Sequence, residues 1–182
     1  MALKIVTAIE NDYSIETLAG NQKLFLAGGI TNCPDWQQDM IDWFELENDK
    51  LRFNNKNDLD LTVYNPRRKN FPIDDPKASE EQICWEFEKL KAADVISFWF
   101  SGGTLNPIVL YELGMWGNSR HVPIFIGIDP EYKREVDVRV QTRLARKDVK
   151  IVSSVTILAE QVLGYLRSVD NWNRNKFVRR TI

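Results

Sequence analysis

Short apolar segments of strand length alternate with longer segments of helical character along this chain. The clearest strand is Val95–Phe100, whose near-continuous apolar run is typical of a strand buried on both faces, as in a parallel sheet. Strands that alternate with helices indicate an α/β domain with a mainly parallel sheet, here of about five strands flanked by helices. The other predicted strands are Leu3–Ile9, Leu24–Ala27, Leu61–Tyr64, Pro123–Ile128 and Lys150–Val152.

Helices are predicted between most of these strands. In Asp35–Glu47, apolar Trp36, Met40 and Phe44 recur at the spacing of an amphipathic helix. Asn106 and Pro107 have the character of an N-cap and a first helical residue. They predict a helix that ends near Trp116, and Val155–Val169 is predicted as the closing helix.

A further helix is predicted over Glu80–Ala92. Ser79 offers an N-cap, and Gln82 three residues later completes a capping-box pattern. The preceding segment, Arg67–Lys77, is expected to be a long loop of the kind that binds ligands. Three apolar residues of the helix share one face: Ile83, Phe87 and Leu90.

The length of 182 residues fits one domain. We predict a Rossmann- or flavodoxin-like α/β domain over 23–170, an N-terminal extension over 1–22 that includes the extra strand, and a basic C-terminal tail over 171–182. A net charge of −2 favours neither nucleic acid nor a membrane surface as a partner. No signal peptide and no membrane-spanning run is recognised, so a cytoplasmic location is expected.

The rare residues narrow the chemistry. His121 is the only histidine, and the two cysteines, Cys33 and Cys84, are far apart without a CxxC motif. This composition fits neither a zinc ribbon nor a thioredoxin motif. The chemistry is therefore expected to use carboxylates, hydroxyls, amides and backbone, with no metal and no cofactor.

In open α/β sheets, ligands bind outside the carboxyl ends of the strands. Three segments lie there: Gly28–Asn32, Asn65–Asp75 and Ser101–Glu112. The first offers glycines, including Gly28 and Gly29, that let backbone amides approach a ligand, although the same glycines also suit a simple turn.

The other two segments carry charge. Arg67 and Arg68 have the guanidinium geometry that suits phosphate oxygens. They equally suit a surface pair neutralised by Asp74 and Asp75. Gly103 belongs to a flexible turn, Ser101 to Thr104, with which the last of the three segments begins.

Two glutamates are candidate catalytic acids. Glu112 follows Pro107 by about one and a half helical turns, and its side chain leans back toward the helix N-terminus, where the site is expected. Glu86 lies at the margin of the apolar stripe of its own helix. Carboxylates act as nucleophiles in glycosyl chemistry. The alternative is that Glu112 bonds a neighbouring loop and that Glu86 belongs to a solvated helix face.

Together these pieces resemble the nucleoside 2-deoxyribosyltransferase-like family, over Leu24 to about Ile128. The ordered set has four parts, and it is most similar to the bacterial and phage branch with the Asn-Pro-Arg-Arg element. The parts are Phe25 to Ile30, Asn65-Pro66-Arg67-Arg68, Trp85 to Ile96, and Ser101 to Gly114.

The resemblance implies roles for individual residues. Glu112 matches the nucleophile that attacks the anomeric carbon of a 2′-deoxyribonucleoside or its 5′-monophosphate, and Glu86 matches an acid that orients the sugar or the departing base. Asn106 occupies a position where nucleoside transferases tend to have Asp and nucleotide hydrolases Ser. Residues implied to contact substrate are Phe25, where a tyrosine is often found, with Gly28, Gly29, Thr31, Arg67, Arg68, Gly103 and Asn106.

The expected partner is therefore a small-molecule nucleoside or nucleotide, and the resemblance implies a homo-oligomer, a dimer or larger. A non-catalytic module that senses a nucleotide or an ADP-ribose-like ligand is the alternative, because Phe25 and Asn106 depart from the active pattern. A purely structural protein is a third option.

Overall fold

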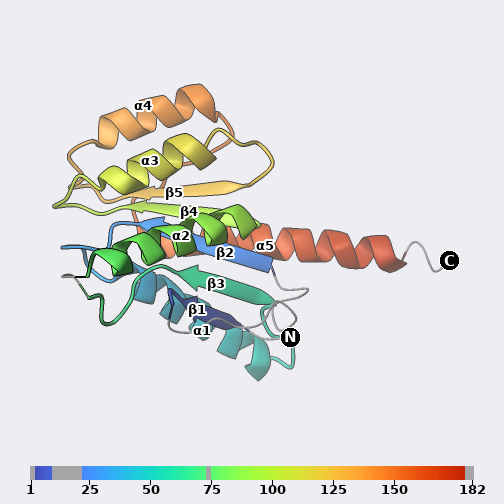
Figure 1. Cartoon of the computed structure of the whole chain (residues 1–182). Coiled ribbons are helices and arrows are strands. Elements are labelled where there is room, and N and C mark those ends of the chain that lie inside the picture. Colours follow the sequence, from blue (N-terminus) through green and yellow to red (C-terminus); the bar gives the residue numbers. More distant parts are fainter. Residues whose placement is uncertain (1–2, 10–21, 73–74, 179–182) are drawn as a thin grey trace.

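The computed structural model describes residues 3–9, 22–72 and 75–178. They form one five-stranded sheet in which every neighbouring pair of strands is parallel. The strand order is β1-β3-β2-β4-β5 (Figure 1). The predicted α/β class and parallel sheet are thus confirmed. The strands are β1 (Lys4–Thr7), β2 (Gln22–Gly28), β3 (Leu61–Asn65), β4 (Val95–Phe100) and β5 (Ile124–Ile128).

Helices cover both faces of the sheet (Figure 1). One core lies between the sheet and the first and last helices, and it contains Leu24 and Leu26 of β2. The second core lies beneath the other three helices and contains Phe25 and Ala27, because successive strand residues point to opposite faces. The helices are α1 (Trp36–Phe53), α2 (Pro76–Ala92), α3 (Pro107–Trp116), α4 (Glu135–Ala145) and α5 (Val155–Val178).

The order of the strands defines where a ligand is expected. After α1 the chain enters β3 on one side of β2, and after α2 it enters β4 on the other side of β2. This reversal makes the carboxyl end of β2 a topological switch point, where α/β sheets leave a crevice. The loops that follow β2 and β4 border that crevice.

The N-terminal strand belongs to this sheet. β1 pairs with β3 from Lys4↔Thr62 to Thr7↔Asn65 and forms one edge. At the other edge, the predicted strand Lys150–Val152 is reduced to a single parallel bridge between Val152 and Gly127. The polar segment 10–21 and the side chains of the basic tail lie outside the described residues.

The start of α2 differs from its prediction. The helix begins at Pro76, and the Asp75 side chain caps it by accepting a hydrogen bond from the backbone N–H of Lys77 at 2.9 Å. The predicted Ser79 cap was wrong because Ser79 already lies in the first turns. A proline at the first position and an aspartate before it provide the stronger start signal.

The buried face of α2 also differs from the apolar stripe. Leu90 is buried, but Ile83 and Phe87 are 64% and 45% exposed. Gln82 is buried in their place, and Glu86 on the same face is half-buried. Polar residues therefore face the sheet at the carboxyl end of β3.

Other elements also differ in length from their predictions: β1 is shorter than the predicted strand Leu3–Ile9, and two helices are longer. α1 continues to Phe53 and α5 to Val178, beyond the predicted ends, and α4 forms in the charge-rich region after β5. Within the described ranges, no helix is at once long and apolar enough to cross a membrane.

Candidate active site

A cavity of about 410 Å³ opens at the carboxyl edge of the sheet. It lies between the end of β2 and its following loop, α2, and the start of α3. Its walls are largely apolar, with two carboxylates, which is the character of a small-molecule site. Seven of the residues predicted from the sequence line it: Phe25, Gly28, Gly29, Thr31, Glu86, Asn106 and Glu112.

Glu112 lies in the second turn of α3 and is 9% exposed. Burial, and secondly the negative charge of Glu86, raise the pKa of Glu112 from 4.5 to about 8. The α3 sequence places this acid here because Pro107 starts the helix directly after the β4 loop. A carboxyl that remains protonated near neutral pH is typical of a functional site.

Glu86 faces the same cavity from α2 and is half-buried. Burial raises the pKa of its carboxyl, and a hydrogen bond from the Gln82 side chain opposes that shift. Because Glu86 raises the pKa of Glu112, the two acids titrate as a coupled pair. Such a pair holds one proton between them over a range of pH, so one member can be an acid while the other is an anion.

Asn106 shapes the wall next to Glu112. Its backbone is left-handed, with a φ of 46°, and its side chain makes no cap hydrogen bond to α3. The Nδ2 group donates to the Ser101 carbonyl at 3.0 Å, and Oδ1 accepts from the Thr104 hydroxyl at 2.8 Å. The predicted helix start is therefore confirmed, but the amide holds the β4–α3 loop instead of capping the helix.

Gly29 makes room for that amide. A Cβ at this position would lie 2.0 Å from Asn106 Oδ1 and 2.6 Å from Cys33 Sγ. The β2–α1 loop can approach the β4–α3 loop only because the side chain is absent. The two loops then form one continuous wall of the cavity.

Aromatic rings support the side of the cavity near Glu86. Phe25 is 1% exposed, lines the cavity and lies 6.3 Å, between ring centroids, from Trp85. Trp85 also packs edge-on against Tyr64 at 6.3 Å. These rings keep the carboxylates in surroundings of low polarity, which is the cause of their raised pKa values.

The two arginines predicted to contact phosphate, Arg67 and Arg68, do not line this cavity. The Arg67 guanidinium donates to the Pro34 carbonyl at 2.9 Å and to Gln37 Oε1 at 3.0 Å, and forms an ion pair with Asp35 at 3.1 Å. It thereby fastens β3 to the start of α1. A role in phosphate binding for this side chain stays a prediction.

Arg68 and Gly103 are also absent from the residues that line the cavity. Arg68 lies over the Phe71 ring, 5.5 Å from its centroid, and Gly103 supplies a φ of 80° to the β4–α3 turn. Their contact with substrate stays a prediction. Of the two acids predicted to neutralise the arginines, Asp75 caps α2, and Asp74 lies outside the described residues.

Sequence reasoning missed the part played by Gln82. Its Nε2 group donates to the Pro66 carbonyl and to Glu86 Oε1, both at 2.7 Å. A polar residue four positions before a candidate acid, and hence on the same helix face, was the available signal. Two apolar residues that line the cavity, Leu105 and Ile108, were also not predicted as site residues.

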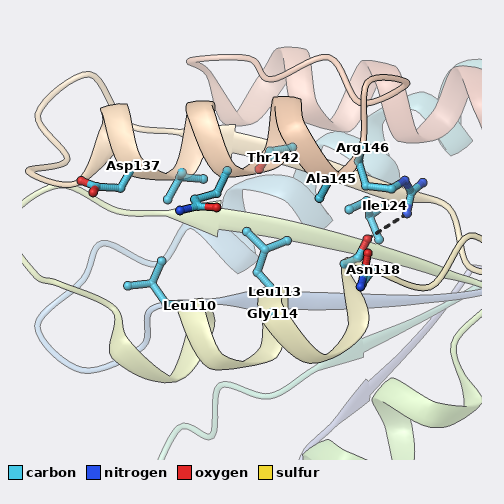
Figure 2. A pocket seen from close by; sticks show the side chains of 12 residues that line it. Leu110, Leu113, Gly114, Asn118, Ile124, Asp137, Thr142, Ala145 and Arg146 are labelled. Atoms are coloured by element: carbon cyan, nitrogen blue, oxygen red, sulfur yellow. Dashed lines mark hydrogen bonds between the residues drawn. The ribbon is translucent and has the colours of Figure 1, made fainter.

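A second cavity of similar volume lies on the other side of α3, between α3 and α4. Figure 2 shows Leu110, Leu113 and Gly114 of α3 facing α4 across this groove, with Arg146 at one end. The Arg146 guanidinium donates a hydrogen bond to the Gly117 carbonyl at 3.1 Å and forms an ion pair with Asp148 at 2.8 Å. The groove lacks a buried acid pair, so the chemistry points to the first cavity.

Fold and site together define an α/β protein with a paired-carboxylate pocket at the switch point of a parallel sheet. Residues 21–132 match the model of the family described as nucleoside 2-deoxyribosyltransferase like, and the chain belongs to this family. The matched segment contains every residue that lines the first cavity. Membership supports an enzyme that acts on a small nucleoside-type ligand. A comparison with curated proteins found no match.

Proposed function

We propose that this protein cleaves or transfers the N-glycosidic bond of 2′-deoxyribonucleosides or their 5′-monophosphates. The nucleophile is Glu112, and Glu86 is the second acid. The observation that carries the proposal is that two carboxyl groups from different helices line one largely apolar cavity, where burial and the charge of Glu86 raise the pKa of Glu112. Cleavage of a glycosidic bond uses such a pair, with one ionised and one protonated carboxyl group beside the same sugar.

In the proposed first step, the proton of Glu112 passes to Glu86, and a Glu112 carboxylate oxygen forms a bond to C1′ while the bond from C1′ to the base nitrogen breaks. The electron pair stays on the base, and the proton of the acid pair moves through Glu86 to the base. The oxocarbenium-like transition state is positive, and the adjacent carboxylate stabilises it in an apolar cavity. In the second step, another base or water attacks C1′ and the bond from C1′ to Glu112 breaks. The proton of the attacking nitrogen or oxygen moves to Glu86, which restores the acid pair.

Incubation with a panel of deoxynucleosides and deoxynucleoside monophosphates, followed by chromatography, tests the proposal. We expect released or exchanged base with the wild type. Glu112→Gln, which keeps the shape but removes the charge, is expected to lower the rate at least about 1,000-fold. Base release that persists unchanged in Glu112→Gln and Glu112→Ala would exclude Glu112 as the nucleophile.

A sensor of a nucleotide or ADP-ribose-like ligand is the alternative. It is favoured by Asn106, because both ends of its amide are used by the protein's own loop. Calorimetry that finds tight binding without turnover over hours would support the sensor. Replacing Arg67 and Arg68 separates phosphate recognition from a structural role, since only the former weakens monophosphates more than nucleosides.

We also propose that the protein is a homo-oligomer that packs through α2 and α3. α3 carries one charged residue, the buried Glu112, yet Ile108 and Tyr111 are 63% and 67% exposed. A helix that is apolar all round is normally buried. Phe87 of α2 continues this surface, with its ring 6.0 Å from that of Trp116.

The area of this surface suits a second copy of the chain. We call it the α2–α3 patch, formed by Ile83, Phe87, Leu105, Ile108, Tyr111 and Met115. Its exposed side chains amount to on the order of 600 Å². One partner contributes roughly 800 Å² to an ordinary stable interface. An uncharged patch meets a copy of itself across a two-fold axis without charge repulsion. Leu105 and Ile108 also line the cavity, so the partner would cover its mouth.

A further inference from the structure

Gln82 connects the candidate acids to the sheet. It lies one turn before Glu86 on α2 and is 8% exposed. Its Nε2 group donates to the carbonyl of Pro66, just after β3, and to Glu86 Oε1, both at 2.7 Å. Pro66 and Glu86 both line the cavity. One amide therefore ties the carboxyl of α2 to the end of the neighbouring strand.

The orientation of this amide is determined by its partners. A backbone carbonyl can only accept hydrogen bonds, so the Gln82 NH₂ group must face Pro66. The same NH₂ group carries a second N–H, which is the one directed at Glu86. The Gln82 Oε1 atom is left buried without a hydrogen-bond partner among the described residues. Burying an unpaired acceptor is unfavourable. The Gln82 amide nevertheless keeps the orientation in which its NH₂ group binds Glu86.

We infer that Gln82 is a positioning residue for Glu86. It holds the carboxyl against the end of β3 and keeps Oε1 an acceptor, so that Oε2 is the oxygen that carries and delivers the proton. The part that Gln82 plays in catalysis rests on the function proposed above. The tether between Gln82 and Glu86 does not.

The groups around Glu86 determine the direction of the pH effect. They are the Glu112 carboxyl, which lines the same cavity from α3, and the Gln82 amide from the preceding turn of α2. The nearby cation of α2, Lys89, lies over the rings of Tyr64 and Trp85. Burial raises the pKa of Glu86, and the Gln82 hydrogen bond opposes this rise. Without the donor, the Glu86 carboxylate loses its stabilising partner, and its pKa rises further.

Gln82→Met removes both N–H donors while nearly keeping the volume of the side chain. The matched control is Gln141→Met, an exposed residue of α4 that lines the second cavity, on the other side of α3 from the acid pair. The readout is the titration of the Glu86 carboxyl by NMR in protein labelled with ¹³C at glutamate carboxyls, with Glu86→Gln identifying the signal. We expect the Glu86 midpoint to rise by about one pH unit in Gln82→Met and to be unchanged in Gln141→Met.

A second variant protects the test against a failure to fold. Gln82→Asn keeps the amide but is one methylene shorter, so it cannot span both partners, and the same upward shift is expected. A Glu86 midpoint equal to that of the wild type in a folded Gln82 variant would overturn the inference.

Kinetics separate this inference from the proposed function. The reactive pair holds one proton, and at low pH a second proton binds to Glu86. The acidic limb of the kcat/KM profile is therefore expected to move to higher pH with the NMR midpoint, while KM changes little. A shifted midpoint in a protein that cleaves no nucleoside would support the tether and contradict the proposed reaction. Cleavage of a nucleoside together with an unshifted Glu86 midpoint would support the proposed reaction and contradict the tether.

Discussion

At the scale of single residues, Glu112 makes the stability of the fold depend on pH. Its pKa is about 8 in the folded protein and near the ordinary 4.5 when unfolded. Between these values, the folded state holds a proton that the unfolded state has released. The free energy of unfolding therefore falls as pH rises through this window.

Glu112→Gln removes this titration. We expect the variant to be more stable than the wild type at about pH 8, by up to about 4 kcal/mol. The difference should shrink toward zero below about pH 3.5, where the wild-type carboxyl is mostly neutral in both states. Urea unfolding followed by circular dichroism at several pH values measures it. A difference that stays constant with pH would contradict the burial of an ionisable carboxyl here.

Two glycines of the site region differ in what surrounds them. Gly29→Ala would place a methyl group 2.0 Å from Asn106 Oδ1, and that amide is buried and bonded at both ends. We expect a loss of about 1–3 kcal/mol in unfolding free energy, together with loss of ligand binding.

Gly114→Ala is the matched control. A Cβ at Gly114 meets nothing within 4 Å, and the residue lies inside α3. This substitution is expected to stabilise the protein by about 0.5–1 kcal/mol, because alanine favours a helix over glycine. Thermal unfolding of both variants checks the pair, and equal effects would show that the two loops do not pack as described.

At the scale of elements, the start of α2 offers a direct comparison. Asp75→Ala removes the side-chain cap that accepts from Lys77 N–H, and we expect a loss of about 1 kcal/mol. Ser79→Ala, inside the helix, is expected to change stability by less than about 0.5 kcal/mol. Denaturant midpoints of the two variants decide between the caps. A larger loss for Ser79→Ala would restore the capping box read from the sequence.

The strands could be predicted from the sequence because strands buried on both faces appear as apolar runs, and Val95–Phe100 is the plainest case. The buried face of α2 could not, because Gln82 and Glu86 occupy the inward positions that apolar residues normally take. Functional residues break the local pattern at the point where the site lies. The periodicity of Ile83 and Phe87 therefore indicated a face that is exposed.

The candidate site could be predicted in outline. The rule for carboxyl ends of strands selects Gly29, Asn106 and Glu112, since each follows a predicted strand closely. The contacts of Arg67 could not be predicted, because its partners, Pro34 and Gln37, lie about thirty residues away in the sequence. Long-range partners of this kind follow from strand order, which the sequence pattern does not contain.

At the scale of the whole molecule, the α2–α3 patch predicts assembly. Sedimentation equilibrium of the wild type should give at least twice the chain mass of 21.2 kDa. Ile83→Lys combined with Met115→Lys places two charges in the patch and is expected to yield single chains. The control is Leu144→Lys, at an apolar position of α4 that is about as exposed as Ile83, and it should leave the assembly intact. A wild type of single-chain mass would contradict the proposal.

The proposed reaction requires Glu112 to form a bond to the sugar. Mass spectrometry of the enzyme, quenched in acid during reaction with a deoxynucleoside or deoxynucleotide, tests this most directly. We expect one added deoxyribosyl group on the peptide that contains Glu112. This adduct should be absent in Glu112→Gln and more abundant when no acceptor base is supplied. Steady turnover without any sugar attached to that peptide would contradict it.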